Sequence, residues 1–88
     1  MTSFENWALL IEPRVAKVAK KFPKRDREHI GIAVAEMRLN PYTGDFTKLE
    51  GGNVWRRRVG SYRIFFEVDQ VARTIIIFRI RRRGSNTY

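Results

Sequence analysis

The chain has 88 residues, 43% of them hydrophobic, which is enough for one domain with a real core and too short for two. Its 18 Lys and Arg outnumber 9 Asp and Glu, and the formal net charge of +9 attracts polyanions such as nucleic acid, an acidic protein or an anionic membrane. The absence of Cys excludes disulfides, thiolate-bound zinc and thiol catalysis. Without a signal-peptide pattern or a membrane-length apolar run, we expect a cytoplasmic protein with no membrane partner.

The N-terminal half predicts one strand followed by two helices. The apolar run Trp7–Ile11 favours a buried strand, and Glu12-Pro13 resembles a helix start. A first helix is expected from Arg14 to Phe22, ended by Pro23, with the apolar face Val15, Val18, Ala19 and Phe22. A second helix follows, closed by Asn40-Pro41, with the buried stripe Ile30, Ala33, Val34 and Met37.

The C-terminal half predicts a loop and three strands. Turn-forming residues dominate 42–53, which we interpret as an exposed loop. The segments Val54–Val59, Tyr62–Val68 and Thr74–Arg81 are rich in β-branched and aromatic residues and predict antiparallel strands. The fold class is therefore α+β over residues 1–88 as a single domain, in the order β-α-α-β-β-β, with both helices on one face of a mainly antiparallel four-stranded sheet.

Strand alternation places most of the arginines on the face away from the helices. In the third strand Tyr62, Ile64, Phe66 and Val68 form an apolar inner face. The inner residues expected in the other strands are Trp55, Val59, Ile76, Phe78 and Ile80. The outer face would then carry Arg56, Arg58, Arg63, Arg79, Arg81 and Arg83, interleaved with Phe65, Ile75 and Ile77. Guanidinium groups bind phosphate through paired hydrogen bonds, so this face suits nucleic acid.

Two features qualify that interpretation. Exposed strands also carry Lys and Arg to prevent edge-to-edge aggregation, and any one of these arginines taken alone is explained in that way. Arg57 is the exception to the pattern, because its parity directs it inward. It must either extend out of the core at a sheet edge or mark a bulge near Trp55.

The sequence also resembles the RelE/ParE toxin superfamily over nearly its whole length. The most specific segment is Arg58-Val59-Gly60-Ser61-Tyr62-Arg63-Ile64, which is close to the family pattern R-V-G-x-Y-R-I. The segments 47–51, 55–66 and 74–80, together with the helix pair, fit the same layout. The resemblance implies a compact α+β toxin of a type II toxin–antitoxin system, held inactive by a cognate antitoxin.

RelE-like members cut messenger RNA in the ribosome, and ParE-like members poison DNA gyrase. The resemblance favours the first activity, with ribosome and mRNA as partners and no cofactor or metal. It assigns the site to Arg56, Arg58, Arg63, Arg83 and Tyr88. The 2′-OH of the ribose would attack the scissile phosphate, which Arg56 and Arg63 would clamp, while Arg83 would support the leaving group. Tyr88 would stack on a base or orient the 2′-OH, although a terminal aromatic can also hang free.

Departures from the family pattern leave other functions open. RelE-like sites commonly place lysines on the strand that here carries Arg56 and Arg58, so a proton acceptor is missing, and Lys48 in the preceding loop is the candidate substitute. We expect Lys48, Arg58, Arg79, Arg81 and Phe65 to contact RNA. The alternatives are a ParE-like gyrase inhibitor and an inactive relative that only binds antitoxin or nucleic acid. The antitoxin segment should be acidic, with apolar anchors that cover Phe65, Ile75 and Ile77.

Overall fold

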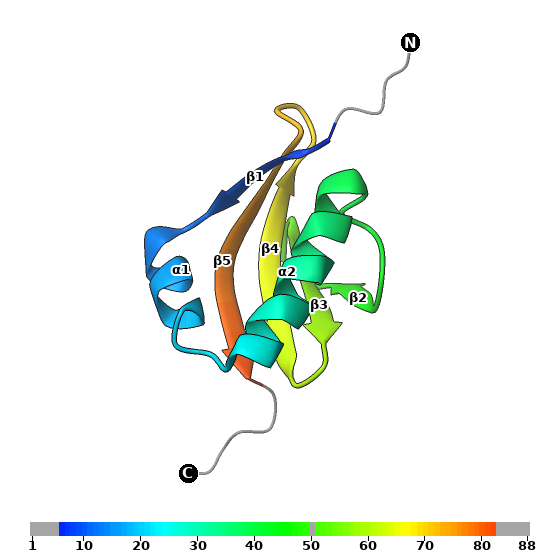
Figure 1. The fold of residues 1–88 in the computed structure, drawn as a ribbon. Coiled ribbons are helices and arrows are strands. Elements are labelled where there is room, and N and C mark those ends of the chain that lie inside the picture. Colours follow the sequence, from blue (N-terminus) through cyan, green and yellow to red (C-terminus); the bar gives the residue numbers. More distant parts are fainter. Residues whose placement is uncertain (1–5, 50, 83–88) are drawn as a thin grey trace.

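Two helices cover one face of a five-stranded sheet in the computed structural model, which describes residues 6–49 and 51–82 (Figure 1). The elements in chain order are β1 (Ala8–Ile11), α1 (Pro13–Ala19), α2 (Lys24–Leu39), β2 (Phe46–Lys48), β3 (Val54–Val59), β4 (Tyr62–Asp69) and β5 (Thr74–Arg82). The predicted α+β order is confirmed. The sheet has one strand more than expected, because β2 lies in the segment predicted as a loop.

The strand order β1-β5-β4-β3-β2 brings the first and last strands together. β1 runs parallel to β5, and all other neighbours are antiparallel. The prediction that β1 is buried is wrong, since Leu10 is 53% exposed and Ile11 is 39% exposed. The reason is that β1 is an edge strand, paired on one side only.

Both helices begin and end near the predicted positions. Pro13 opens α1, which stops at Ala19, three residues before the predicted end, because the chain tightens into a turn in which Phe22 N–H donates to the Ala19 carbonyl at 3.1 Å. α2 follows Pro23 and ends where Asn40 turns extended before Pro41. Figure 1 shows α2 crossing the sheet at β3 and β4, with α1 beside β5.

The core lies between this helix layer and the inner face of the sheet. The alternation predicted for β4 is confirmed, and all four of its inner residues are buried. The buried apolar residues are Trp7, Val15, Ile30, Ala33, Met37, Tyr62, Ile64, Phe66, Val68, Ile75 and Ile77. A sheet packed on one side leaves its other face open to solvent, and this is the face that bears the arginines.

The faces predicted for the first half of β5 are wrong. Ile75 and Ile77 are fully buried, whereas Ile76 lies opposite Glu67 on the outer face. The cause is a β-bulge at Phe78: Phe66 pairs with Ile77 and Phe65 with Arg79, so one residue of β5 is skipped. The bulge reverses the alternation, and beyond it Arg79 and Arg81 return to the predicted outer face while Ile80 pairs with inner Ile64.

Neither helix in the described part of the chain is long and apolar enough to cross a membrane.

Candidate nucleic-acid interface

Two cross-strand rows of arginines lie on the outer face of β3, β4 and β5. In the first row Arg56 and Arg79 flank Phe65. The second row consists of Arg58, Arg63 and Arg81. Paired residues on adjacent strands project to the same side, so the six side chains share one surface, which we call the arginine face. Of the six arginines predicted for this face, five are brought together, and Arg83 lies outside the described residues.

Four of the five arginines on the arginine face have no ion-pair partner among the described residues. Within residues 6–49 and 51–82, the two ion pairs involve Arg14 with Glu12 and Arg57 with Glu36, and neither arginine belongs to this face. Arg56, Arg58, Arg79 and Arg81 form no ion pair with the described carboxylates. Like charges directly opposite one another destabilise a sheet. The two rows therefore form a region of positive electrostatic potential that favours binding of an anion.

An aromatic pair adds apolar surface between the charges. The ring of Phe78, displaced by the bulge, lies 6.4 Å from the ring of half-buried Phe65, centroid to centroid, at 50°. Exposed aromatic faces among cations are suited to stacking nucleobases. The alternation rule missed Phe78 by assigning it to the core. The sequence does contain a sign of this irregularity, the unbroken apolar run Ile75-Ile76-Ile77-Phe78. A regular strand with one solvent-exposed face would alternate apolar and polar residues instead.

The sheet surface is polarised along its strands. The arginine rows lie toward the β3–β4 turn, whereas Glu67 and Asp69 occupy the following rows of β4, toward the β4–β5 turn. Asp69 is engaged locally, because its Oδ1 accepts the backbone N–H of Ala72 at 3.0 Å. A bound polyanion is thus attracted to one end of the face and repelled from the other.

Arg57 belongs to the opposite face. It is 7% exposed, its Nη2 lies 2.5 Å from Glu36 Oε1, and its Nη1 donates to the Ala33 carbonyl at 3.3 Å. The β3–β4 register is continuous through this point, so the bulge considered near Trp55 is absent from this described segment. Arg57 is an anchor between β3 and α2 and takes no part in the arginine face.

Gly44 closes the other side of the Arg57 guanidinium. An added Cβ at Gly44 would stand 2.7 Å from Arg57 Cζ, and its φ of +78° is a conformation that other residues rarely adopt. Neither Glu36 nor Gly44 can be identified from the sequence as a partner of Arg57, because the three residues lie far apart in the chain. The anchor fixes β3, and with it the outward direction of Arg56 and Arg58.

Lys48 does not reach the arginine face. It lies in β2 rather than in a loop, opposite Trp55, with Nζ 5.7 Å from the Trp55 ring centroid. Its neighbour Thr47 is the residue that pairs with Arg56. The alternation of β2 therefore places Lys48 on the same side as Arg57, away from the arginine rows.

Tyr62 is the titratable group whose environment is most clearly altered. Burial raises the pKa of the Tyr62 hydroxyl above its usual 10.0, and the hydrogen bond donated to Asp26 Oδ2 at 2.8 Å and the charge of Asp26 add to that rise, while Arg82 opposes it. Tyr62 thus holds its proton firmly at neutral pH and links the start of α2 to β4. Arg83 and Tyr88, two residues assigned to the site from sequence, lie outside the described residues.

The sequence profile described as the ParE toxin of the type II toxin–antitoxin system parDE matches residues 9–87. A comparison with curated proteins gives no match.

Three solved structures of toxins and toxin–antitoxin complexes are similar to this chain. The RelB–RelE antitoxin–toxin complex of Methanococcus jannaschii contains a chain that is 33% identical, with a TM-score of 0.70, 86% of this chain and 92% of that chain being covered. The archaeal RelE–RelB complex of Pyrococcus horikoshii OT3 matches at 24% identity and a TM-score of 0.81, over 92% and 99% of the two chains. Isolated RelE toxin of E. coli matches at 17% identity and 0.78, over 91% and 87%.

Proposed function

We propose that this chain, which belongs to the ParE toxin family of type II toxin–antitoxin systems and has a RelE-like fold, is a ribosome-dependent endoribonuclease that cleaves messenger RNA. The observation that supports this most directly is the arginine face, where two rows of guanidinium groups surround an aromatic pair on an open sheet. Single-stranded RNA offers the two matching features, a closely spaced phosphate chain and bases that can be unstacked.

The reaction we propose is attack of the ribose 2′-OH on the adjacent phosphate. The new bond joins O2′ to phosphorus, the bond from phosphorus to the 5′-oxygen breaks, and the proton lost from O2′ is balanced by one gained at the leaving oxygen. Negative charge on the phosphate rises in the transition state. Arginine stays protonated throughout, so its contribution is to hold the phosphate in line and stabilise that charge.

In the proposal, each residue of the arginine face has a role that follows from its position on the sheet. Arg56 and Arg63 belong to adjacent rows on neighbouring strands, and in the proposal they clamp the scissile phosphate. Arg58, Arg79 and Arg81 hold the flanking backbone, and Phe65 stacks against a base. Arg83 and Tyr88 keep their proposed parts in leaving-group support and base stacking. Lys48 has no part in the proposal, because it lies on the other side of the sheet.

The test is a cleavage map from reconstituted translation. Ribosomes loaded with a defined mRNA are incubated with the purified chain, and new 5′ ends are located by primer extension. Removing one preorganised charge-stabilising group typically lowers a rate by about a hundredfold or more, so Arg56→Ala should abolish most cleavage. Lys21→Ala removes the same charge from an exposed turn between the two helices and should leave cleavage unchanged. An intact mRNA with the unmodified chain would rule the proposal out.

A second candidate is inhibition of DNA gyrase, favoured by the match to the ParE toxin profile. That activity requires a binding surface and no cutting site. A supercoiling assay with purified gyrase separates the two, since the leading proposal expects full supercoiling at chain concentrations that cleave mRNA on ribosomes.

We also propose a cognate antitoxin as the partner that keeps the chain inactive. Relatives of this fold were crystallised with RelB antitoxins, in the complexes from M. jannaschii and P. horikoshii OT3. The net charge of +9 favours an acidic partner. The apolar anchors predicted earlier for that partner cannot use Ile75 and Ile77, which are fully buried in the core.

A further inference from the structure

A small hollow borders the arginine face where α1 packs beside β5. Its volume is about 230 Å³. We call it the edge pocket, and the residues that line it are Arg14, Val15 and Val18 of α1 and Phe78, Arg79 and Ile80 of β5. Arg79 also ends the first arginine row, next to Phe65. The edge pocket therefore continues that row beyond the last strand that carries it.

The edge pocket exists because β1 is shorter than β5. β1 ends at Ile11, which pairs with Ile77, and Phe78 is the next residue of β5. From Phe78 onward, no strand in the described part of the chain pairs with this side of β5. A strand edge of this kind presents backbone N–H and C=O groups without a ladder partner. The pocket thus combines apolar side chains with a polar backbone edge.

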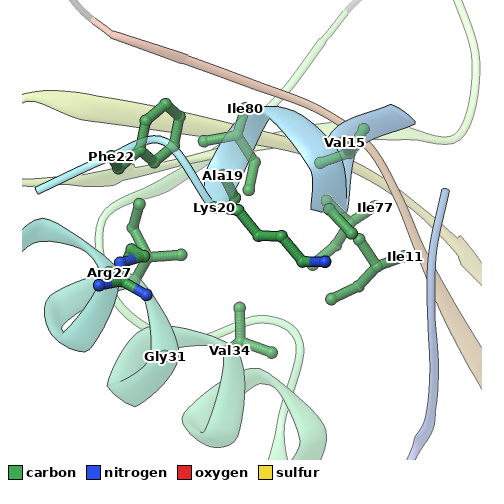
Figure 2. A pocket seen from close by; sticks show the side chains of 12 residues that line it. Ile11, Val15, Ala19, Lys20, Phe22, Arg27, Gly31, Val34, Ile77 and Ile80 are labelled. Atoms are coloured by element: carbon green, nitrogen blue, oxygen red, sulfur yellow. The ribbon is translucent and has the colours of Figure 1, made fainter. Parts of the chain in front are cut away.

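Val15 and Ile80 close the edge pocket on its inner side. Both also line a larger apolar hollow of about 340 Å³ between α1 and α2, which Figure 2 shows. These two side chains therefore separate the two spaces. The edge pocket differs from the larger hollow because its lining includes Phe78 and Arg79, which belong to the outer side of the sheet. A ligand on the arginine face can extend into the edge pocket without entering the core.

The bulge makes the ring of Phe78 part of both the aromatic pair and the edge pocket. The rings of Phe65 and Phe78 are inclined by 50°, so they cannot both stack on one flat base, and each offers a face to a separate base. The order across the sheet is Arg56, Phe65, Arg79 and then the edge pocket. This alternation of cation and stacking surface matches the alternation of phosphate and base along single-stranded RNA.

The charged residues of the edge pocket are both arginines. Arg79 forms no ion pair with the described carboxylates, and Arg14 pairs with Glu12 at 3.5 Å through a side chain that is 80% exposed. So exposed a pair contributes little, which leaves Arg14 available to a phosphate. No Asp or Glu is among the described residues that line the pocket. Its volume is below the range of about 300–1,000 Å³ typical of small-molecule sites, which suits a single flat ring system.

We propose that the edge pocket holds one nucleobase of the bound RNA, stacked on Phe78, while Arg79 and Arg14 hold the phosphates on either side of it. This inference rests on the RNA-binding function proposed for the arginine face, and it adds a contact beyond that face. Since Arg56 holds the scissile phosphate and Phe65 the base next to it, the base in the edge pocket belongs to the second nucleotide from the cut. The pocket therefore determines how the strand is positioned at that nucleotide.

The test compares two probes that carry the same phosphates. One is an oligouridylate of about six nucleotides, and the other is the matching strand of abasic ribose phosphates. Each is titrated into the isotope-labelled full chain, and the methyl groups are followed by NMR. We expect the oligouridylate to shift the methyl groups of Val18 and Ile80, which carry no charge to attract a phosphate, and the abasic strand to leave them unchanged. Uridine monophosphate lacks the further phosphate contacts and should need a concentration about tenfold higher or more.

Matched variants locate the base. Val18→Trp fills the edge pocket and should weaken oligouridylate binding by about fivefold or more, whereas Val71→Trp adds the same ring at a turn residue that is 99% exposed and should leave binding within about twofold. Phe78→Leu loses the stacking face and should weaken binding similarly, while Phe78→Tyr keeps the ring and should retain it. Arg14→Ala should weaken binding by about threefold, and Lys17→Ala, which removes an exposed charge of α1 outside the pocket, by less.

Several outcomes would overturn the inference. These are no shift of the Val18 and Ile80 methyl groups with oligouridylate, equal shifts with the abasic strand, equal weakening by Val18→Trp and Val71→Trp, or binding of uridine monophosphate as tight as that of the oligouridylate, which would make the pocket a site for free nucleotides. The shifts are measured on the unsubstituted chain, so they do not depend on how a variant folds.

The titration contains no ribosomes, so it is independent of the cleavage assay. A negative cleavage map together with base-dependent shifts would refute the nuclease and leave the edge pocket as an RNA-binding site. Cleavage without those shifts would refute the edge pocket alone.

Discussion

Arg58 of β3 and Arg63 of β4 are directly opposed cross-strand partners, and Arg81 of β5 continues the same row. Like charges directly opposite one another destabilise a sheet, so we expect repulsion within this row to lower the stability of the free fold. A bound phosphate would relieve it.

Replacing that repulsion with attraction should stabilise the sheet. Arg58→Glu places a carboxylate opposite Arg63, and cross-strand charge pairs of this kind contribute up to about 1 kcal/mol. In a domain of this size the gain corresponds to a rise in Tm of roughly 4–8 °C, measured by thermal unfolding. Lys21→Glu makes the same change in net charge on an exposed turn. An equal rise in that control would assign the effect to overall charge and remove the role of the row.

The Arg57–Glu36 pair should make a measurable contribution to stability. Glu36→Ala leaves the buried guanidinium with the Ala33 carbonyl as its remaining acceptor, and a buried charged group that loses a partner costs about 1–3 kcal/mol. Since the Glu36 side chain is 54% exposed and water replaces part of the interaction, we expect the lower half of that range from denaturant unfolding. A change within error would mean that the pair contributes nothing.

Gly44 and Arg57 should be energetically coupled. Gly44→Ala forces a Cβ to 2.7 Å from the Arg57 guanidinium and a positive φ on a residue with a side chain, with a combined cost of about 1–3 kcal/mol. In the Arg57→Met background the clash is removed and only the backbone term remains. A double-mutant cycle should therefore show coupling of at least about 0.5 kcal/mol. Additive effects of the two substitutions would show that glycine is needed at position 44 only for the backbone conformation of its turn.

The raised pKa of Tyr62 predicts that the stability of the fold falls at alkaline pH. Because its pKa is raised in the native state, Tyr62 keeps its proton at pH values where the unfolded chain loses it. The contribution of Tyr62 to the free energy of unfolding is fully present below pH 10, and it is lost as the pH rises through the raised pKa of the native state. Tyr62→Phe should cost about 0.5–1.5 kcal/mol at neutral pH through loss of the hydrogen bond to Asp26, and the difference from the unsubstituted chain should shrink at high pH. Parallel stability curves across that range would contradict the raised pKa.

The sequence was sufficient to predict the faces of β4 and the position of most arginines, because alternation is strict where one side of a strand is buried. It failed in the first half of β5. The segment Ile75-Ile76-Ile77-Phe78 is apolar at every position, so its pattern carries no information about which residues face inward. Only pairing with β4 locates the bulge at Phe78, and Arg79 and Arg81 were placed correctly because the alternation resumes beyond it.

Other features depended on contacts between distant segments. β2 is three residues long, and its pairing with β3 defines it as a strand within a turn-rich stretch. Strand alternation in the sequence predicts that Arg57 faces inward. It does not predict the partners of Arg57, because Glu36 comes from α2 and Gly44 from a loop. The cost of burying a guanidinium is met by long-range pairing, which local patterns do not encode. For the same reason, the sequence alone favours Lys48 as a site residue, and only its position beside Trp55 in the structure removes it from the arginine face.

The most direct test of the arginine face is the salt dependence of RNA binding. The affinity for a single-stranded oligonucleotide, measured by fluorescence anisotropy over a range of salt concentrations, falls with a logarithmic slope of about 0.7 for each phosphate contact. We predict that Arg56→Ala combined with Arg79→Ala lowers this slope by about 1.4, while Lys21→Ala combined with Lys24→Ala, which removes equal charge from the helical hairpin, leaves it unchanged. An unchanged slope for the first variant, with a reduced slope for the second, would contradict the assignment of the RNA site to the arginine face.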